Sequence, residues 1–424
     1  MTHYSFVGLQ FGDEGKGKAF TTLIDMINNF MERVDLTIKD NKILTHRHQG
    51  GGNAGHTGVV DKVEYKLHQI PTGVIMRNTY NLMGFGMFIN PRKAMAEIKQ
   101  LREKDLLVTP KKLGICSKAH MTLDFHVASD QAAFNKKDHT STGNGIKETA
   151  IDKYGRQGLR FVEFLDPNAM GRILTKRFGE NVPDGRRIKE FVDSYNLERL
   201  FFAPFLTSEQ QAFENRDFIV GEGAQGVLLD VGSGLYPGVT SSHPANLPHH
   251  PDKVIGVFKS YVSSVGKDRP FVSKIGGDLE EELRQEWGEF GTTTGKPRDL
   301  GWLDVVALKY AVKESGTDYM IATCGDRLEA LAEREEKVKV VVAYEIDGQR
   351  YEEWQPSFDN RETLYKAKPV FEEFEPWDQF VVHGEIHPNA KKVYDFIEEK
   401  TEVPICMIST GPAEKDVIVY QNIF

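Results

Sequence analysis

Residues 4–18 read YSFVGLQFGDEGKGK, and this stretch decides the fold class. Residues 4–9 form a short apolar run that predicts a buried strand. After a glycine-rich turn, residues 16–34 carry apolar side chains at helical spacing, among them Phe20, Leu23 and Ile27. A strand, a glycine-rich turn and a helix in this order predict an α/β protein that binds an anion where the helix begins, because free backbone N–H groups point outward there.

The turn itself, residues 12–18 with the sequence GDEGKGK, has the composition of a phosphate-binding loop with acids added. Its glycines and Lys18 fit the G-x-x-x-x-G-K pattern, but Ala19 stands where an ordinary P-loop NTPase has the Ser or Thr that binds magnesium. Asp13 and Glu14 would repel bound phosphates unless a carboxylate binds Mg²⁺ or moves a proton. The loop therefore predicts phosphate binding coupled to metal or acid–base chemistry, against the alternative of a solvated charged turn.

Further glycine-rich stretches follow at residues 50–58, 221–238 and 291–301, in a chain with 39 glycines. Glycine lets backbone N–H groups approach a ligand closely, so several such loops predict one large ligand site rather than isolated tight turns. In the first of them, a run of small residues precedes His56. A histidine in so approachable a backbone is a candidate general acid, although a single histidine is more often structural or on the surface.

The composition excludes several classes of protein. With 53 Lys and Arg against 62 Asp and Glu in 424 residues, the net charge is −9, so we expect neither a nucleic acid nor a membrane as partner. Cys116, Cys324 and Cys406 lie far apart, which favours neither a disulfide framework nor a zinc site and fits a reducing cytoplasm. No apolar run reaches the roughly 18 residues that a membrane span needs, and the N-terminus has no signal-peptide pattern.

The rest of the chain alternates between strand and helix patterns. Helices are expected at residues 92–103, 124–135, 186–201, 303–312 and 389–400. Extended segments are expected at 42–45 and 58–70, buried parallel strands at 218–220, 254–261, 319–323 and 404–408, and a hairpin at 337–351 with Asp347-Gly348 in its turn. This order predicts a large, mostly parallel sheet in a single domain, residues 1–424, with inserted subdomains.

Five ordered motifs together resemble the adenylosuccinate synthetase family. They are GDEGKGK at 12–18, NAGHT at 53–57, EGAQG at 222–226 with VTSS at 239–242, GTTTG at 291–295, and STGP at 409–412. The resemblance covers residues 4–418 and implies the fold of that family. It also implies a ligase that makes adenylosuccinate from IMP, L-aspartate and GTP with Mg²⁺, through a purine phosphorylated on its 6-oxygen.

The resemblance also implies roles for individual residues. Asp13 would be the catalytic base and a metal ligand, His56 the acid, and the Gly55 carbonyl a second metal contact. GTP would be bound by Gly12, Glu14, Gly15, Lys16, Gly17, Lys18, Arg298, Asp326, Ser409 and Gly411. IMP would be bound by Asn53, Thr142, Arg156, Gln225, Thr240 and Lys296, with Arg156 reaching the partner subunit of a homodimer. L-Aspartate would be bound by Thr292, Thr293, Thr294 and Asn144.

Some positions depart from the family pattern around the amino acid. Asn144 and Lys296 replace arginines that face the aspartate in the family. Arginine holds a carboxylate through two hydrogen bonds, whereas lysine acts only as a point charge, so another amine donor is an alternative to aspartate. Lys147, in the same loop as Asn144, is a candidate to compensate for the lost charge.

Other departures concern the purines. Cys324-Gly325-Asp326 keeps the acid that reads guanine but lacks the lysine of the family pattern, which leaves ATP as an alternative donor. Phe11 replaces a tryptophan, as in phage 2-aminoadenylosuccinate synthetases that act on (d)GMP. Those enzymes lack the acid that corresponds to Asp13, so its presence here favours IMP. A non-catalytic nucleotide binder need not keep both Asp13 and His56, so the two together favour an enzyme.

Overall fold

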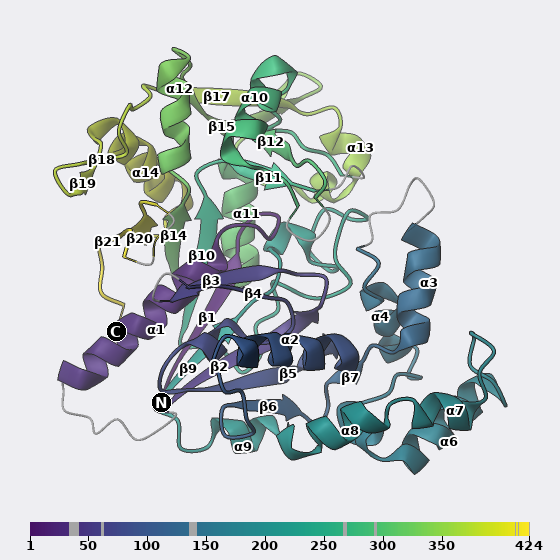
Figure 1. Ribbon diagram of the computed structural model, residues 1–424. Helices are drawn as coiled ribbons and strands as arrows, with labels where there is room; N and C mark the ends of the chain where they lie inside the picture. The colour runs from purple at the N-terminus through teal and green to yellow at the C-terminus, as the bar shows by residue number, and fades with distance from the viewer. Residues whose placement is uncertain are drawn as a thin grey trace. The chain divides into compact units, whose positions relative to one another are not determined.

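Mostly parallel strands with helices around them organise the chain, as the sequence predicts (Figure 1). The computed structural model describes residues 1–33, 42–60, 63–134, 142–265, 269–291, 295–411, 413 and 415–423. The chain forms two compact units. The first contains residues 1–4 and 20–224, and the second contains residues 5–19 and 225–424. The chain passes from one unit to the other within β1 (Thr2–Gly8), within α1 (Lys16–Arg33) and after β9 (Phe218–Glu222).

The first unit contains strands in the order β9, β2 (Ile43–Gly51), β5 (Thr79–Ile89), β6 (Leu113–Cys116) and β8 (Leu206–Thr207). Adjacent strands in this order pair in parallel, and β7 (His120–Met121) also pairs with β5. All nine residues of β2 are buried, which is typical of a parallel strand covered on both faces. Its polar residues therefore lie inside the protein and need partners there.

Helices and short strands complete the first unit. They are β3 (His56–Val60), β4 (Val63–Leu67), α2 (Pro91–Glu103), α3 (Asp124–Phe134), α4 (Ile146–Tyr154), α5 (Phe161–Leu165), α6 (Pro167–Phe178), α7 (Ile188–Asp193), α8 (Asn196–Phe202) and α9 (Glu209–Phe213). β3 and β4 form an antiparallel pair, and both contain part of the extended segment expected at 58–70.

One expected helix, residues 186–201, is wrong as a single element. The structure has α7 and α8, with Ser194 and Tyr195 between them. Tyr195 is buried there, its hydroxyl accepts a hydrogen bond from the Asp124 backbone, and the guanidinium of Arg92 lies 4.5 Å from its ring centre. The chain turns to bury this ring, and Leu200, expected on the same apolar face, is 78% exposed.

The second unit has strands in the order β10 (Lys253–Lys259), β14 (Tyr319–Thr323), β20 (Ile405–Ser409) and β21 (Val417–Val419), of which only the last pair is antiparallel. A smaller sheet contains β13 (Leu303–Asp304), β15 (Val338–Ile346), β16 (Gln349–Tyr351) and β17 (Lys368–Phe374). The predicted hairpin is confirmed in β15 and β16, where Asp347 and Gly348 have φ of 50° and 80°. Both values lie in the left-handed region that Asp and Gly tolerate best.

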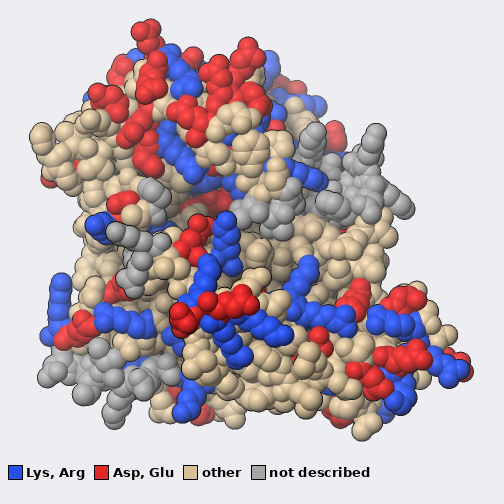
Figure 2. Space-filling model, in the orientation of Figure 1, with Lys and Arg blue, Asp and Glu red and all other residues tan. Residues whose placement is uncertain are grey.

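The second unit also contains β11 (Val262–Ser264), α10 (Gly277–Trp287), β12 (Asp299–Gly301), α11 (Val305–Ser315), α12 (Glu329–Glu333), α13 (Arg361–Leu364), β18 (Val381–Val382), β19 (Glu385–Ile386) and α14 (Pro388–Thr401). Acidic side chains gather over α10, α12 and β17, next to the lysines and arginines that they pair with (Figure 2). Among the described residues, none of the helices has both the length and the apolar character that a bilayer crossing needs.

Candidate functional site

The loop between β1 and α1 has a shape that depends on glycine. Gly12 has φ of +98°, in the region that other residues rarely adopt. A Cβ atom on Gly12 would also lie 2.9 Å from the Cα of Gln225. The loop therefore packs closely against residue 225, and a side chain at position 12 would not fit there.

Glu14 holds this loop together from inside. Its side chain is 1% exposed, and one carboxylate oxygen accepts hydrogen bonds from the backbone N–H groups of Gln10 at 3.1 Å and Gly12 at 2.7 Å. The other oxygen pairs with Nζ of Lys16 at 2.5 Å. The Glu14 side chain thus shapes the loop, which leaves Asp13 as the more exposed of its two acids.

Lys18 connects the loop with the end of the chain. Its Nζ donates to Oγ of Ser409 and to the Asp416 carbonyl, both at 2.8 Å, and to the Gly411 carbonyl. Burial lowers the pKa of Lys18, and the nearby charges of Asp416 and Asp326 partly oppose this. The loop, residues 409–411 and Asp326, which lie far apart in the sequence, are therefore neighbours within the second unit.

Asp13 lies against two cations. Its carboxylate pairs with Arg298 and lies 3.6 Å from Nζ of Lys259, while its side chain remains 39% exposed. The buried Glu289 binds the same two cations, with distances of 2.7 Å to Lys259 and 2.6 Å to Arg298. Burial by itself would raise the pKa of Glu289, but these two cations lower it to about 2. Glu289 therefore stays ionised and fixes the cations that contact Asp13.

Sequence reasoning identifies Asp13 and Arg298 but misses Lys259 and Glu289. Lys259 ends an apolar strand, and Glu289 stands alone before the GTTTG motif. The one available signal is the charge of Lys259 near the carboxyl end of the predicted buried strand 254–261, since ligand sites gather at the carboxyl ends of parallel strands.

The residues around Asp13 fit a Mg²⁺ ion that is bound mainly by its substrate. In the part of the chain that the structure describes, no group of three His, Cys, Asp or Glu side chains gathers to hold a metal. Mg²⁺ commonly takes one or two carboxylates and completes its shell with phosphate oxygens and water. Asp13, which is partly exposed in the glycine-rich loop, would supply that kind of ligand.

His56, in the first unit, contacts a buried ion pair. Nη1 of Arg47 lies 2.7 Å from Nδ1 of His56, and Arg47 is also 3.7 Å from the carboxylate of Glu222. A guanidinium can only donate, so Nδ1 accepts and the ring proton is on Nε2. Nη1 of Arg47 also lies 3.2 Å from Nε2, but Nε2 lies closer, at 3.0 Å, to the carbonyl oxygen of Ile70, which can only accept and therefore requires the proton on Nε2. Nε2 is also 3.5 Å from Glu222.

Arg47 and Glu222 are further residues that sequence reasoning misses. They are paired across β2 and β9, and Glu222 also accepts hydrogen bonds from the backbone and hydroxyl of Thr72 at 2.8 and 2.7 Å. Burial lowers the pKa of Arg47, and the charge of Glu222 opposes this. This pair sets both the position and the tautomer of His56. In the sequence, Glu222 opens the EGAQG motif, whereas the only signal of Arg47 is a charged residue close to an extended run.

Asn144 is buried before α4, and its neighbours differ from those expected. Its amide N–H donates to Oγ1 of Thr142 at 3.0 Å, and its amide oxygen accepts from Nζ of Lys93 at 2.5 Å. Lys147, the expected replacement for the missing arginine, pairs instead with Glu148 at 3.3 Å. Lys93 is therefore the cation that contacts Asn144, and nothing in the local sequence identifies it.

The remaining candidates are distributed over both units. Asn53, Gly55, Thr142 and Arg156 belong to the first unit, and Gln225, Thr240 and Lys296 belong to the second. Gln225 has φ of 58°. Its buried amide atoms have no hydrogen-bond partner among the described residues, and this is typical of a side chain that binds a ligand. Thr292, Thr293 and Thr294 lie outside the described residues, so the aspartate contacts expected there stay a prediction.

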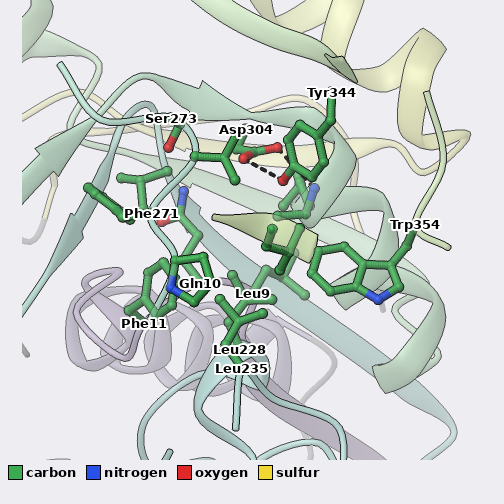
Figure 3. Close-up of a pocket in the computed structure, with 16 residues that line it drawn as sticks. Leu9, Gln10, Phe11, Leu228, Leu235, Phe271, Ser273, Asp304, Tyr344 and Trp354 are labelled. Carbon is green, nitrogen blue, oxygen red and sulfur yellow. Dashed lines mark hydrogen bonds between the residues drawn. The ribbon is translucent and has the colours of Figure 1, made fainter. Parts of the chain in front are cut away.

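An apolar pocket lies next to the loop in the second unit (Figure 3). Its polar members satisfy each other, since the Tyr344 hydroxyl donates to Asp304 at 2.7 Å and Asp304 caps α11 through the Ala307 N–H. Burial raises the pKa of Asp304 to about 6. A triphosphate would lose its hydration in such surroundings, so it belongs on the open loop rather than in this pocket. The apolar lining includes Leu9, Phe11, Leu228, Leu235, Phe271 and Trp354.

Comparison with known proteins agrees with these features. The family model for adenylosuccinate synthetase matches residues 5–418. Adenylosuccinate synthetase from Prochlorococcus marinus (strain MIT 9211) is 34% identical, over 100% of this chain and 97% of the relative. The enzyme of the same name from Aquifex aeolicus (strain VF5) is also 34% identical, over 100% of this chain and 98% of the relative.

Solved structures show the same likeness. The fully ligated adenylosuccinate synthetase from Plasmodium falciparum has a TM-score of 0.83 and 27% identity, over 99% of each chain. The succinoaminodeoxyadenylate synthetase of cyanophage S-2L, bound to dGMP and dATP, has a TM-score of 0.57 and 16% identity, over 99% of this chain and 95% of its own. At that identity the phage enzyme shares the fold alone.

Proposed function

The chain belongs to the adenylosuccinate synthetase family, and from this we propose that it converts IMP and L-aspartate to adenylosuccinate, with GTP as phosphoryl donor and Mg²⁺ as cofactor. The family consists of ligases that form a C–N bond, and the chain is such a ligase. The observation that carries the proposal is the partly exposed Asp13, held by Arg298 and Lys259 within a phosphate-binding loop.

The chemistry requires a base and a phosphoryl donor in one site. The 6-oxygen of hypoxanthine is a poor leaving group, and phosphorylation turns it into a good one that the aspartate amine displaces. Asp13 would take the N1 proton, which makes the 6-oxygen nucleophilic. Bound Mg²⁺ would neutralise charge on the phosphates, and Asp13 and the Gly55 carbonyl are its proposed protein ligands.

His56 would act as the acid in phosphoryl transfer. Because Arg47 donates to Nδ1, the ring carries its proton on Nε2, the atom from which it can be donated. In the structure this proton points at the Ile70 carbonyl, which a ligand oxygen would have to replace. The buried Arg47–Glu222 pair keeps the ring in this orientation.

We also propose a homodimer in which Arg156 contacts the nucleotide of the partner subunit. Arg156 is exposed directly after α4, with φ of 59°. On the same helix, Ile151 is 57% exposed and Tyr154 is 62% exposed. Large apolar side chains next to an exposed arginine are typical of a protein interface.

The predicted cytoplasmic location agrees with Cys116, Cys324 and Cys406, which are all free thiols.

A second candidate uses ATP as the donor or (d)GMP as the acceptor. The observation behind it is Gly325, where a Cβ atom would lie 2.2 Å from the hydroxyl of Tyr394 and 2.4 Å from the ring of Phe380. Aromatic side chains therefore occupy the space that a larger residue at position 325, next to Asp326, would need. Asp326 remains beside Lys18 and keeps an acceptor suited to the guanine N1–H and amino groups.

Phosphate release tests these candidates directly. IMP, GMP or dGMP is combined with GTP or ATP and L-aspartate, and each component is then omitted in turn. We expect phosphate release that requires IMP, GTP, L-aspartate and Mg²⁺ together, with adenylosuccinate detected by its absorbance. Release that needs no nucleoside monophosphate refutes the proposal, and release that prefers GMP or ATP favours the second candidate.

A further inference from the structure

Lys93, Asn144 and Thr142 form a hydrogen-bonded chain in the first unit. Nζ of Lys93 lies 2.5 Å from Oδ1 of Asn144, and Nδ2 of Asn144 lies 3.0 Å from Oγ1 of Thr142. Asn144 is 8% exposed, so its amide depends on these partners. Lys93 is itself exposed, with its charged end directed at the buried amide.

The chemistry of these groups fixes the direction of every hydrogen bond in the chain. An ammonium group can only donate, so the Asn144 atom that faces Lys93 must be the amide oxygen. The amide nitrogen then faces Thr142 and must donate to its hydroxyl oxygen. Because that oxygen accepts from Asn144, the hydroxyl proton of Thr142 turns away from the chain and can be donated to another group.

The position of Lys93 is electrostatically unfavourable for its own helix. Lys93 lies in the first turn of α2, and that turn contains no acidic residue. A cation at a helix N-terminus opposes the helix dipole. Among the described residues, no carboxylate forms an ion pair with Lys93. A lysine with this placement stabilises something other than α2.

We propose that Lys93 is a positioning residue for the nucleotide substrate: through Asn144 it turns the Thr142 hydroxyl proton outward, so that the hydroxyl donates to a phosphate oxygen of the nucleoside monophosphate. The proposal rests on the proposed function and on the expectation from the family resemblance that Thr142 binds that nucleotide. It gives Asn144 a role different from that of the arginine in the family pattern. Lys93 fixes the orientation of the Asn144 amide, and the amide in turn orients the Thr142 hydroxyl. Asn144 does not itself bind the carboxylate of the amino acid.

Substitutions that remove or reverse the hydrogen bonds from Lys93 through Asn144 to Thr142 test this proposal. Lys93→Met removes the charged donor and keeps the length of the side chain. Asn144→Asp keeps an acceptor for Lys93 but cannot donate to Thr142, so the hydroxyl proton turns inward. Thr142→Val removes the hydroxyl with little change in shape. Lys99→Met is the matched control, because Lys99 is an exposed lysine of the same helix.

The readout is the dissociation constant of the nucleoside monophosphate, measured by titration calorimetry, together with KM values for all substrates. We expect Lys93→Met and Asn144→Asp each to weaken nucleotide binding about tenfold, as the loss of one charge-assisted hydrogen bond does. KM for L-aspartate should stay the same, and Lys99→Met should bind like the wild type. Lys93→Met should have no further effect in the Thr142→Val background, because the two residues act through one chain.

The outcomes separate this proposal from the proposed function. Additive effects of Lys93→Met and Thr142→Val would contradict the proposal that the two residues act through one series of hydrogen bonds. A Lys93→Met variant that binds the nucleotide normally would contradict it too. An increase in the aspartate KM without a change in nucleotide binding also overturns it, since Lys93 would then face the amino acid. A wild-type protein that neither binds IMP or GMP nor turns it over refutes the proposed function itself.

Discussion

Replacing Glu289 with glutamine tests whether this buried carboxylate organises the cations around Asp13. Glu289 is 1% exposed and contacts Lys259, Arg298 and Arg327 at 2.7, 2.6 and 3.1 Å. Glutamine preserves the shape of the side chain but removes the charge that balances these cations. Lys259 is itself buried, so the uncompensated charge cannot be relieved by water.

The size of the effect follows from the pKa of Glu289. Burial acts to raise this pKa, yet Lys259 and Arg298 lower it from the ordinary value of 4.5 to about 2. At about 1.4 kcal/mol for each pKa unit, the carboxylate stabilises the folded state by about 3 kcal/mol at neutral pH. Removing one partner from a buried ion pair typically costs about 3–5 kcal/mol, which agrees with this value.

The pH dependence has a defined direction. Because the pKa of Glu289 is lower in the folded state than in the unfolded state, its contribution is complete above pH 4.5 and disappears as the pH falls toward 2. We therefore expect Glu289→Gln to unfold in urea with a free energy about 3 kcal/mol below the wild type at pH 7. The difference should shrink as the pH falls from 5 toward 2.

Glu286→Gln is the matched control. Glu286 belongs to α10, is 42% exposed and pairs with Arg334 at 2.7 Å. An exposed pair of this kind contributes about 0–1 kcal/mol, so this variant should remain close to the wild type. If Glu289→Gln lowers the free energy of unfolding at pH 7 by no more than Glu286→Gln does, Glu289 does not balance the buried cations. A difference that stays constant between pH 7 and 3 would show that the charge of Glu289 is not the cause.

Three further predictions concern the reaction. Asp13→Asn keeps the shape of the side chain and removes its basicity, so kcat for phosphate release should fall by at least about 100-fold; near-normal turnover would exclude Asp13 as the base. Arg156→Leu and Asp13→Ala proteins should each be inactive and regain activity when mixed, because a hybrid dimer restores one complete site; full activity of Arg156→Leu in a protein that sedimentation shows to be monomeric contradicts this. Lys296→Arg should lower the KM for L-aspartate about 10- to 100-fold by restoring a bidentate contact, and an unchanged KM would show that Lys296 does not face the amino acid.

Local patterns predict most elements of the fold. The helix expected at 16–34 is observed as Lys16–Arg33, and the strand expected at 319–323 has the same bounds in the structure. Both signals are contained within the segment itself, as helical spacing or as a short apolar run between polar residues. The helix expected at 186–201 fails because the burial of Tyr195, under contacts from Arg92 and Asp124, decides where the chain turns. Those contacts come from residues distant in sequence.

The candidate site likewise contains residues that local patterns identify and residues that they do not. Glycine-rich loops and their motifs identify Asp13, His56 and Asp326. A backbone that approaches a ligand closely requires glycine, and a glycine-rich stretch is recognisable in the sequence. Arg47 and Lys93 are not identified, because each is explained only by a partner that another segment supplies. The expected strand at 42–45 stops short of β2, which continues to Gly51, for a related reason. Residues 46–49 are polar, and the partners of His46, Arg47 and Gln49 are Glu209, Glu222 and Ala224, which are distant in sequence.

Several of the site residues nevertheless share a position at or near the end of a strand. Arg47 and Glu222 are paired toward the carboxyl ends of β2 and β9. Lys259 and Thr323 are paired at the carboxyl ends of β10 and β14, and Ser409 ends β20. Parallel strands bring their carboxyl ends to one edge, where ligands bind in sheets of this kind. A polar residue that ends a buried strand is therefore a candidate site residue even without a motif, and Lys259, which ends β10, is the clearest example in this chain.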